Sequence, residues 1–189
     1  MTISIECSIE FNGSSLADII NATLINHPGP QHPPGGSNTG QFYGGGLYDG
    51  SRYAFTDASA DFGLQVQGAL SYSGTPTHVL HGSLDQLTLG GAINLSSGDF
   101  INTPTLRLNF TPSLNFTPSL NGSLPDGGSL HSSVWGLMNN AISAPGQLLD
   151  LLQSQGLTLS DPLPCSGLLG HLAEPAWWSI SHWFMQLLG

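Results

Sequence analysis

The sequence predicts an α+β domain in which helices pack on one face of an antiparallel sheet. Short stretches of alternating apolar residues, separated by Gly-rich turns, are typical of a meandering antiparallel sheet. From Ser129 onward the apolar residues instead recur at helical spacing. Strands first and helices last are characteristic of α+β domains. The expected strands cover 62–72, 78–89, 92–95 and 105–110, and the expected helical segments cover 130–142 and 148–152.

The first two elements can be placed from local signals. The alternation of apolar and polar residues in 3–9 predicts a half-buried strand. Ser14 or Ser15 together with Asp18 resembles a helix start, and the apolar residues that follow keep a helical spacing until a Pro-rich segment begins at His27. A short helix is therefore expected directly after the first strand.

Two further segments are predicted to be surface connections. The stretch 28–50 concentrates Pro, Gly, Asn and Ser beyond what a strand or helix tolerates. The hexapeptide Asn-Phe-Thr-Pro-Ser-Leu occurs twice, at 109–114 and 115–120. Two copies cannot bury the shared core of a solenoid, so we interpret the duplication as a loop lengthened just beyond the last strand.

Composition narrows the functional class. With 189 residues, of which 39% are hydrophobic, the chain is long enough for one domain with a sizeable core. Lysine is absent, Arg52 and Arg107 are the fixed cations, and the formal net charge is −10. Nucleic-acid binding requires a basic face that displaces counterions, so this composition argues against it, and it disfavours an anionic lipid surface for the same reason.

The two cysteines are expected to be free. Cys7 lies on the apolar side of the first expected strand, where a small core residue is needed. The long separation from Cys165 and the size of the expected core argue against a disulfide framework. A bridge between the two is the alternative.

The two ends of the chain differ in character. The N-terminus has neither a basic region nor an apolar run, so no cleavable N-terminal secretion signal is predicted. From Cys165 the sequence crowds Trp and Leu, but at most twelve residues separate Pro175 from Leu188, which is too short for a membrane span. This tail has three interpretations: a docked core helix, an interfacial amphipathic helix or a C-terminal export signal.

Five segments, in order along the chain, together carry a family resemblance. They are 37–45, 49–54, 68–72, 78–87 and 131–138. Over roughly residues 2–160 the sequence resembles the HasA-type secreted haemophores, the haem-acquisition proteins of Gram-negative bacteria. The resemblance implies a curved antiparallel sheet backed by helices, with haem held between two loops at its edge. It divides the chain into a haem-binding domain, 1–160, and a tail, 161–189.

The same resemblance implies a biological role. Such a protein leaves the cell through type I secretion machinery by means of a C-terminal signal, acts as an extracellular monomer, and captures haem. It then delivers the haem to an outer-membrane haemophore receptor. A Gly-x-Ser-x-Gly, a His-Glu-x-x-His and a Cys-x-x-Cys motif are all absent from the sequence, so an enzyme is not predicted. The alternative function is a binder of non-haem metal or a small ligand that keeps the haemophore fold.

The resemblance also places the iron site. It puts the loop histidine on His32, the tyrosine ligand on Tyr72, and the histidine that hydrogen-bonds this tyrosine on His78, so His32 and Tyr72 are the expected ligands of ferric haem b. The chemistry is compatible, because a phenol with a pKa near about 10 must lose its proton to bind iron(III), and both the iron and a nearby imidazole favour the phenolate. His27 is a rival for His32. The connection from Tyr72 to His78 is shorter than is usual in the family, which makes His81 a rival for His78.

A stripe of three residues completes the expected site. His131, Trp135 and Met138 are spaced i, i+4 and i+7 and therefore share one helix face. By resemblance these three positions line the haem pocket, and Tyr53 supplies aromatic wall. The alternative is that Trp135 and Met138 are core residues with His131 at their rim.

Overall fold

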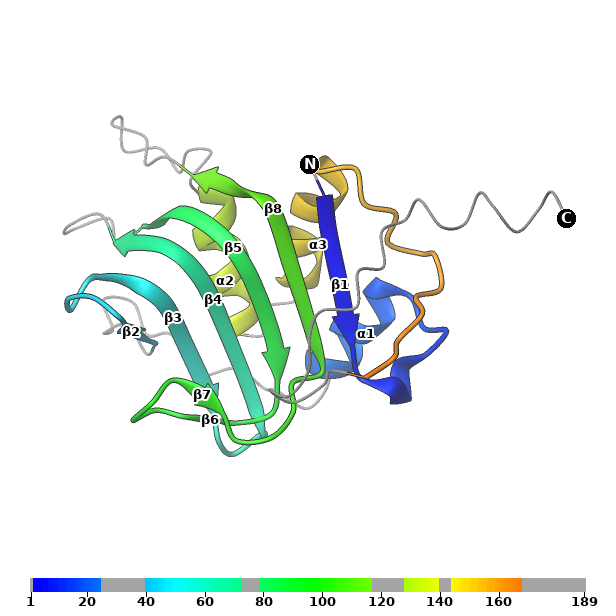
Figure 1. Ribbon diagram of the computed structural model, residues 1–189, viewed down its shortest axis with the longest axis horizontal. Coiled ribbons are helices and arrows are strands. Elements are labelled where there is room, and N and C mark those ends of the chain that lie inside the picture. The colour runs from blue at the N-terminus through cyan, green and yellow to red at the C-terminus, as the bar shows by residue number, and fades with distance from the viewer. Residues whose placement is uncertain (1, 25–39, 73–78, 117–127, 140–143, 168–189) are drawn as a thin grey trace, which may run out of the picture.

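The computed structural model describes residues 2–24, 40–72, 79–116, 128–139 and 144–167 (Figure 1). Its main sheet has six antiparallel strands in the order β1-β8-β5-β4-β3-β2. These strands are β1 (Thr2–Cys7), β2 (Gln41–Tyr43), β3 (Asp49–Asp57), β4 (Phe62–Tyr72), β5 (Leu80–Gly90) and β8 (Leu106–Phe116). A small hairpin of β6 (Ile93–Asn94) and β7 (Asp99–Phe100) precedes β8. The helices are a 3-10 turn (Ile9–Phe11), α1 (Leu16–Leu24), α2 (Gly128–Asn139) and α3 (Ala144–Ser154).

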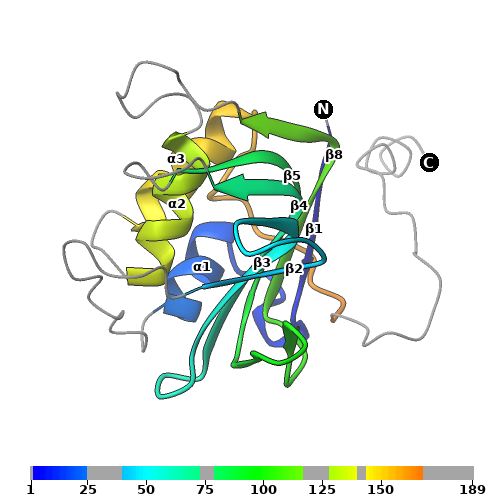
Figure 2. The same cartoon turned by 90° about the vertical axis from the view of Figure 1, so that its left-hand side faces the viewer.

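The three α-helices lie together on one face of the curved sheet (Figure 2). The core forms between these two layers, where alternate strand residues such as Leu64, Leu89 and Leu108 are fully buried. Helix α1 adds its apolar side through Leu16 and Ile19. Burying each such side chain contributes about 1.5–3 kcal/mol. The predicted α+β class, with helices on one face of a curved antiparallel sheet, is confirmed.

Helix α1 begins where its capping signal predicts. The Ser15 hydroxyl accepts a hydrogen bond from the Asp18 backbone N–H at 3.2 Å and donates one to the Asp18 carboxylate at 2.6 Å. Ser15, rather than Ser14, is therefore the N-cap, which satisfies one of the amides that the first helical turn leaves without a partner.

The last strand is longer than predicted. Strand β8 continues past Phe110 to Phe116, so the first copy of the hexapeptide is part of the sheet and not of a loop. The pairing with β5 shifts register between Leu84 and Gln86, and Pro112 lies in the resulting irregularity, where a missing N–H costs little. Beyond it the aromatic residue of the second copy, Phe116, is buried in the core. Residues 117–120 of that copy lie outside the described residues.

Part of the predicted loop 28–50 is also regular structure. Phe42 is buried and lies in β2, a three-residue strand that pairs with β3. The prediction was wrong here because three residues between glycines are too few for a period-2 signal. Residues 28–39 lie outside the described residues.

A disulfide joins Cys7 to Cys165, with Cα atoms 5.0 Å apart, so the expectation of two free cysteines was wrong. The chain after α3 returns to the end of β1, where Leu163 exchanges backbone hydrogen bonds with Gly13 and Ser14, each 2.9 Å long. The Asn12 side chain also accepts from the Cys165 backbone N–H. Sequence separation is thus no obstacle, because tertiary structure brings the two residues together. Residues 161–167 lie against the body of the domain, and 168–189 are outside the described residues.

The sheet bends sharply near the ends of β4 and β5. Both strands change register there, and a Cβ at Gly68 would overlap the Ser83 carbonyl oxygen, whereas one at Gly82 would overlap the Ala69 carbonyl oxygen. Gly82 also has a φ of +118°, which a side chain would strain. Figure 2 shows the ends of both strands curving toward α2. The bend therefore brings Tyr72, the last residue of β4, close to a helix. Within the described residues, no helix is long and apolar enough to span a membrane.

Candidate functional site

Tyr72 lies at the centre of a group of side chains on the helix-facing side of the sheet. Its ring meets Phe42 of β2 at 5.2 Å, Tyr53 of β3 at 5.8 Å and His131 of α2 at 6.2 Å between centroids. All three contacts are close to perpendicular, the edge-to-face arrangement that aromatic quadrupoles favour. Together with Met138, these four residues are called the tyrosine cluster below.

Tyr53 and Met138 form the buried floor of the tyrosine cluster. Tyr53 is 0% exposed and Met138 3% exposed, and the Tyr53 hydroxyl donates to the Met138 sulfur at 3.6 Å. A buried hydroxyl needs such a partner. The two residues predicted as pocket wall therefore lie behind Tyr72, against the core. Trp135 belongs to α2, but its side chain is outside the described part of the structure.

The surroundings of Tyr72 shift the pKa of its phenol. Burial raises the pKa of the Tyr72 phenol above its usual value, and a side-chain hydrogen bond with Tyr53 partly offsets this by lowering the pKa. The neutral phenol is therefore the stable form at pH 7. Near neutral pH, a cation such as iron(III) that replaces the proton would favour the phenolate.

The two chain segments that carry His32 and His78 adjoin this cluster, although both histidines lie outside the described residues. Segment 25–39 rejoins the described chain at Gly40, where a Cβ would overlap the Tyr53 hydroxyl oxygen. Segment 73–78 leaves from Tyr72 itself and returns at Val79, which is buried. His27 is likewise outside the described residues. Gly40 was missed as a site residue, although a glycine next to a strand is a known sign of close backbone approach.

His81 lies on the opposite face of the sheet from Tyr72. The β4–β5 register pairs Ser71 with His81 and Tyr72 with Leu80, and directly paired residues project to the same face. Leu80 is fully buried on the helix side with Tyr72, so His81 faces outward with Ser71. Burial lowers the pKa of His81. The register therefore disfavours His81 as a partner of the Tyr72 hydroxyl.

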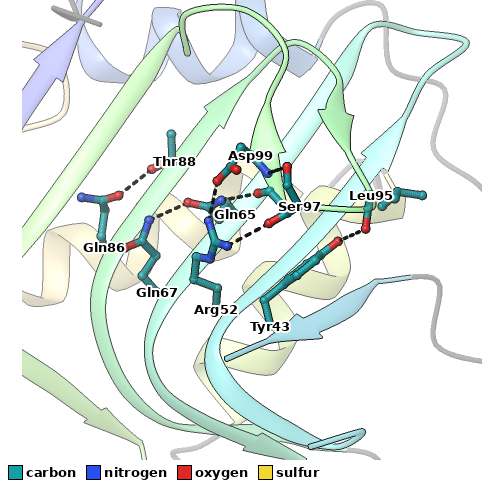
Figure 3. Close-up of polar contacts among 10 residues, drawn as sticks. Tyr43, Arg52, Gln65, Gln67, Gln86, Thr88, Leu95, Ser97 and Asp99 are labelled. Carbon is teal, nitrogen blue, oxygen red and sulfur yellow. Dashed lines mark hydrogen bonds and ion pairs between the residues drawn. The ribbon is translucent and has the colours of Figure 1, made fainter. Parts of the chain in front are cut away.

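Both arginines lie on that outer face as well. Arg52 binds the Asp99 carboxylate at 2.7 Å and the Ser97 carbonyl at 2.9 Å, and its guanidinium lies 5.4 Å from the Tyr43 ring centroid (Figure 3). Arg107 pairs with Glu6 at 2.9 Å. Arg52 and Arg107 each alternate with inward core residues along their strands, so neither guanidinium is directed at Tyr72.

The outer face has its own polar network, which the sequence did not predict. Gln65 is buried and donates to the Gly98 carbonyl at 2.6 Å, which fixes the β6–β7 hairpin over β4 (Figure 3). The Gln67 amide donates to Gln65, and the Tyr43 hydroxyl donates to the Leu95 carbonyl. Tyr43 therefore lies on the outer face, and Tyr48 is 61% exposed. Of the four tyrosines, only Tyr53 and Tyr72 belong to the tyrosine cluster.

Comparison with known proteins agrees with this geometry. The family model of "Heme-binding protein A (HasA)" matches residues 1–176. Among individual proteins, the hemophore HasA of Serratia marcescens is 31% identical over 170 residues, covering 85% of this chain and 87% of that protein. Two crystal structures of the hemophore HasA from Yersinia pestis share the fold. The holo form is 24% identical with a TM-score of 0.69 and covers 85% of this chain and 93% of that one. An apo form is 23% identical with a TM-score of 0.72 and covers 89% and 100%. This chain therefore belongs to the HasA family of haem-binding proteins.

Proposed function

We propose that this protein is a secreted, extracellular carrier that binds ferric haem b without turnover and delivers it to an outer-membrane haemophore receptor. The observation that carries the proposal is the position of Tyr72. It ends β4 beside α2, and the segments bearing His32 and His78 both join the described chain at the tyrosine cluster. One segment rejoins the chain at Gly40 beside Tyr53 and the other starts at Tyr72, so both connect to the tyrosine cluster, as a site for a flat molecule held from both faces requires.

Tyr72 and His32 are the proposed iron ligands. The residues present fit haem, because a phenol kept neutral by burial gives up its proton to iron(III), and the cluster around it is aromatic and apolar. His78 is proposed to accept a hydrogen bond from the Tyr72 hydroxyl, which would help the phenol to lose its proton. His131 and Trp135 are proposed to approach the porphyrin from α2, with Tyr53 and Met138 supporting Tyr72 from behind.

Haem itself would supply the iron(III) centre, while the chain provides orientation and a partly buried environment. The edge-to-face contacts with Phe42 and Tyr53 hold the Tyr72 ring in one orientation. The same packing partly buries the Tyr72 side chain, and a lower local dielectric strengthens any bond between a phenolate and a cation. Binding thus depends on iron ligation together with apolar contact.

A hemin titration followed by absorbance tests the function directly. We expect a Soret band to grow with added hemin until one equivalent is bound, with a charge-transfer band typical of a tyrosinate ligand. Tyr43→Phe is the matched control, since it removes a hydroxyl from the outer face and should bind as the wild type does. A titration with no saturable Soret change would reject the haem carrier and favour a protein that uses this fold for another ligand.

Several observations bear on location and partners. The Cys7–Cys165 disulfide supports an extracellular location, because such bonds persist in oxidising compartments. We propose that export uses type I secretion machinery and a signal in the tail, and that the protein is monomeric. The division into a domain, 1–160, and a tail, 161–189, is kept as part of this proposal, with 161–167 docked on the domain.

Acidification is expected to weaken hemin binding. Because burial raises the pKa of Tyr72, the phenol carries its proton at neutral pH, and ligation to iron must release it. Lower pH opposes that release, and it also protonates His78, whose imidazolium can no longer accept from the phenol. Affinity should therefore fall as pH drops through the histidine range, as measured by hemin titrations at successive pH values.

His78→Ala should remove the additional fall in affinity that sets in within the histidine range, leaving the slope from the Tyr72 proton. His81→Ala is the matched control, because His81 faces the other side of the sheet and its pKa lies below the usual value. It should retain the wild-type profile. The reverse ranking of the two variants would show that His81 supports Tyr72.

The haem propionates are expected to face solvent. The chain has two fixed cations, and Arg52 and Arg107 are both paired with carboxylates on the outer face. A buried propionate would therefore have no guanidinium partner and would meet a net charge of −10. Hemin dimethyl ester should bind within about threefold of hemin, since exposed carboxylates are well screened.

Arg52→Gln is the internal control for that comparison and should leave hemin affinity unchanged. A large loss on esterification would show that the propionates are firmly held. If Arg52→Gln produced the same loss, the arginine would be identified as the group that holds them.

A further inference from the structure

We propose that His131 is a positioning residue that holds Tyr72 in place through the backbone amide of Leu80. This deepens the proposed function, since it concerns the same site and rests on Tyr72 as the iron ligand. The inference begins with one hydrogen bond: the Leu80 N–H donates to Nδ1 of His131 at 3.1 Å. It joins the first residue of β5 to the first turns of α2.

The Leu80 amide needs this acceptor. Leu80 is 0% exposed, so water is not a ready substitute, and an unpaired buried N–H costs about 1–3 kcal/mol. The partner is a side chain 51 positions further along the sequence, which therefore fixes a tertiary contact. Because Nδ1 accepts, the proton of the neutral ring is on Nε2.

Leu80 in turn determines where Tyr72 lies. Tyr72 and Leu80 are directly paired, and they are the last pair of the β4–β5 ladder before the chain enters segment 73–78. On the other side, Tyr72 is held by a hydrogen bond from its N–H to the Tyr48 carbonyl at 2.8 Å. Because Tyr72 is paired with Leu80, a displacement of Leu80 would also displace the backbone of Tyr72.

The His131 ring also touches Tyr72 itself, edge-on, at 6.2 Å and an interplanar angle of 74°. One imidazole thus contacts both members of the closing pair, Leu80 through its nitrogen and Tyr72 through its ring. We infer that α2 sets the geometry of the tyrosine ligand through His131.

The test uses substitutions that separate the acceptor from the ring. In His131→Asn, the side-chain oxygen occupies the place of Nδ1 and can still accept from Leu80. Ser is too short to do so, and Leu fills the space without an acceptor. Hydrogen exchange of the Leu80 amide in the protein without hemin reports the anchor. The hemin dissociation constant and the tyrosinate charge-transfer band report its effect on Tyr72.

We expect faster Leu80 exchange, a shifted charge-transfer band and hemin binding about 10–100-fold weaker in His131→Leu and His131→Ser. His131→Asn should restore all three readouts toward wild type. Wild-type behaviour of His131→Ser would overturn the inference. Equal loss in Asn and Ser variants would overturn it too, because the imidazole ring, and not the acceptor that it offers to the Leu80 N–H, would then set hemin affinity.

The design also keeps this inference distinct from the haem proposal. If wild-type protein fails to bind hemin, the proposed function fails, whereas Leu80 exchange still decides whether His131 anchors the strand. If wild-type protein binds hemin and the Ser variant does so equally well with an unchanged spectrum, the anchor fails and the carrier function stands.

Discussion

Tyr72→Phe is expected to weaken hemin binding by more than about 100-fold, because loss of even an indirect partner of a metal ligand costs 10–100-fold. Phenylalanine keeps the edge-to-face packing with Phe42 and Tyr53, so the fold should be unaffected. What is lost is the oxygen that brings negative charge to iron(III). The charge-transfer band of the tyrosinate should vanish from the absorbance spectrum at the same time.

The companion variant is His32→Ala, which should weaken binding less than Tyr72→Phe does. A histidine contributes a neutral donor, whereas a phenolate offsets the charge of the metal. Affinities are measured by competition, so that tight binding is resolved. Equal affinities for wild type and Tyr72→Phe would show that Tyr72 is not an iron ligand. A greater loss of affinity in His32→Ala would show that the histidine is the dominant ligand.

Removing the disulfide is expected to lower stability without changing the site. The bond spans 158 positions, for which the chain-entropy model gives about 5 kcal/mol and measured bridges typically give 2–4 kcal/mol. The double variant Cys7→Ala, Cys165→Ala should therefore melt about 5–20 °C below wild type. Hemin affinity at 25 °C should be retained, because β1 is separated from β4 by two strands.

Wild-type protein treated with reductant provides the control for the cysteine variant. Its melting temperature should fall to that of the double variant, and thiol titration should confirm that both sulfurs are free. An unchanged melting temperature after confirmed reduction would show that the packing around 157–167 alone holds the C-terminal segment in place.

The elements that sequence predicts well are those whose signals are local. Helix α1 has a capping serine and an apolar stripe, and β4 has a clear alternation, so both were placed correctly. The duplicated hexapeptide was interpreted as a loop, yet β8 continues through its first copy, because the register shift opposite Asp85 makes a place where Pro112 is tolerated. Whether Cys7 is free or disulfide-bonded depends on Cys165, which lies 158 positions away, so no local sequence pattern can predict it.

The candidate site divides in the same way. Family resemblance singled out Tyr72 as a ligand, which stays a prediction, and the structure places this residue at the end of β4. Sequence alone could not decide the role of His81, since the face that a residue occupies after a turn depends on the register, and the β4–β5 register shifts once near this end of the two strands, at Gly68 and Gly82. The hydrogen bond from Leu80 to His131 could not be predicted from the sequence either. Its donor is a backbone amide, which every residue except proline carries.

The bond between Cys7 and Cys165 also has a topological consequence for the proposed export. A chain closed there is a ring that contains nearly the whole domain, so it cannot pass through a narrow channel as a single thread. Transit therefore requires both sulfurs as thiols, with closure afterwards on the oxidising side. Under the proposed export, the protein would therefore leave as a linear chain and become a closed ring only after oxidation outside.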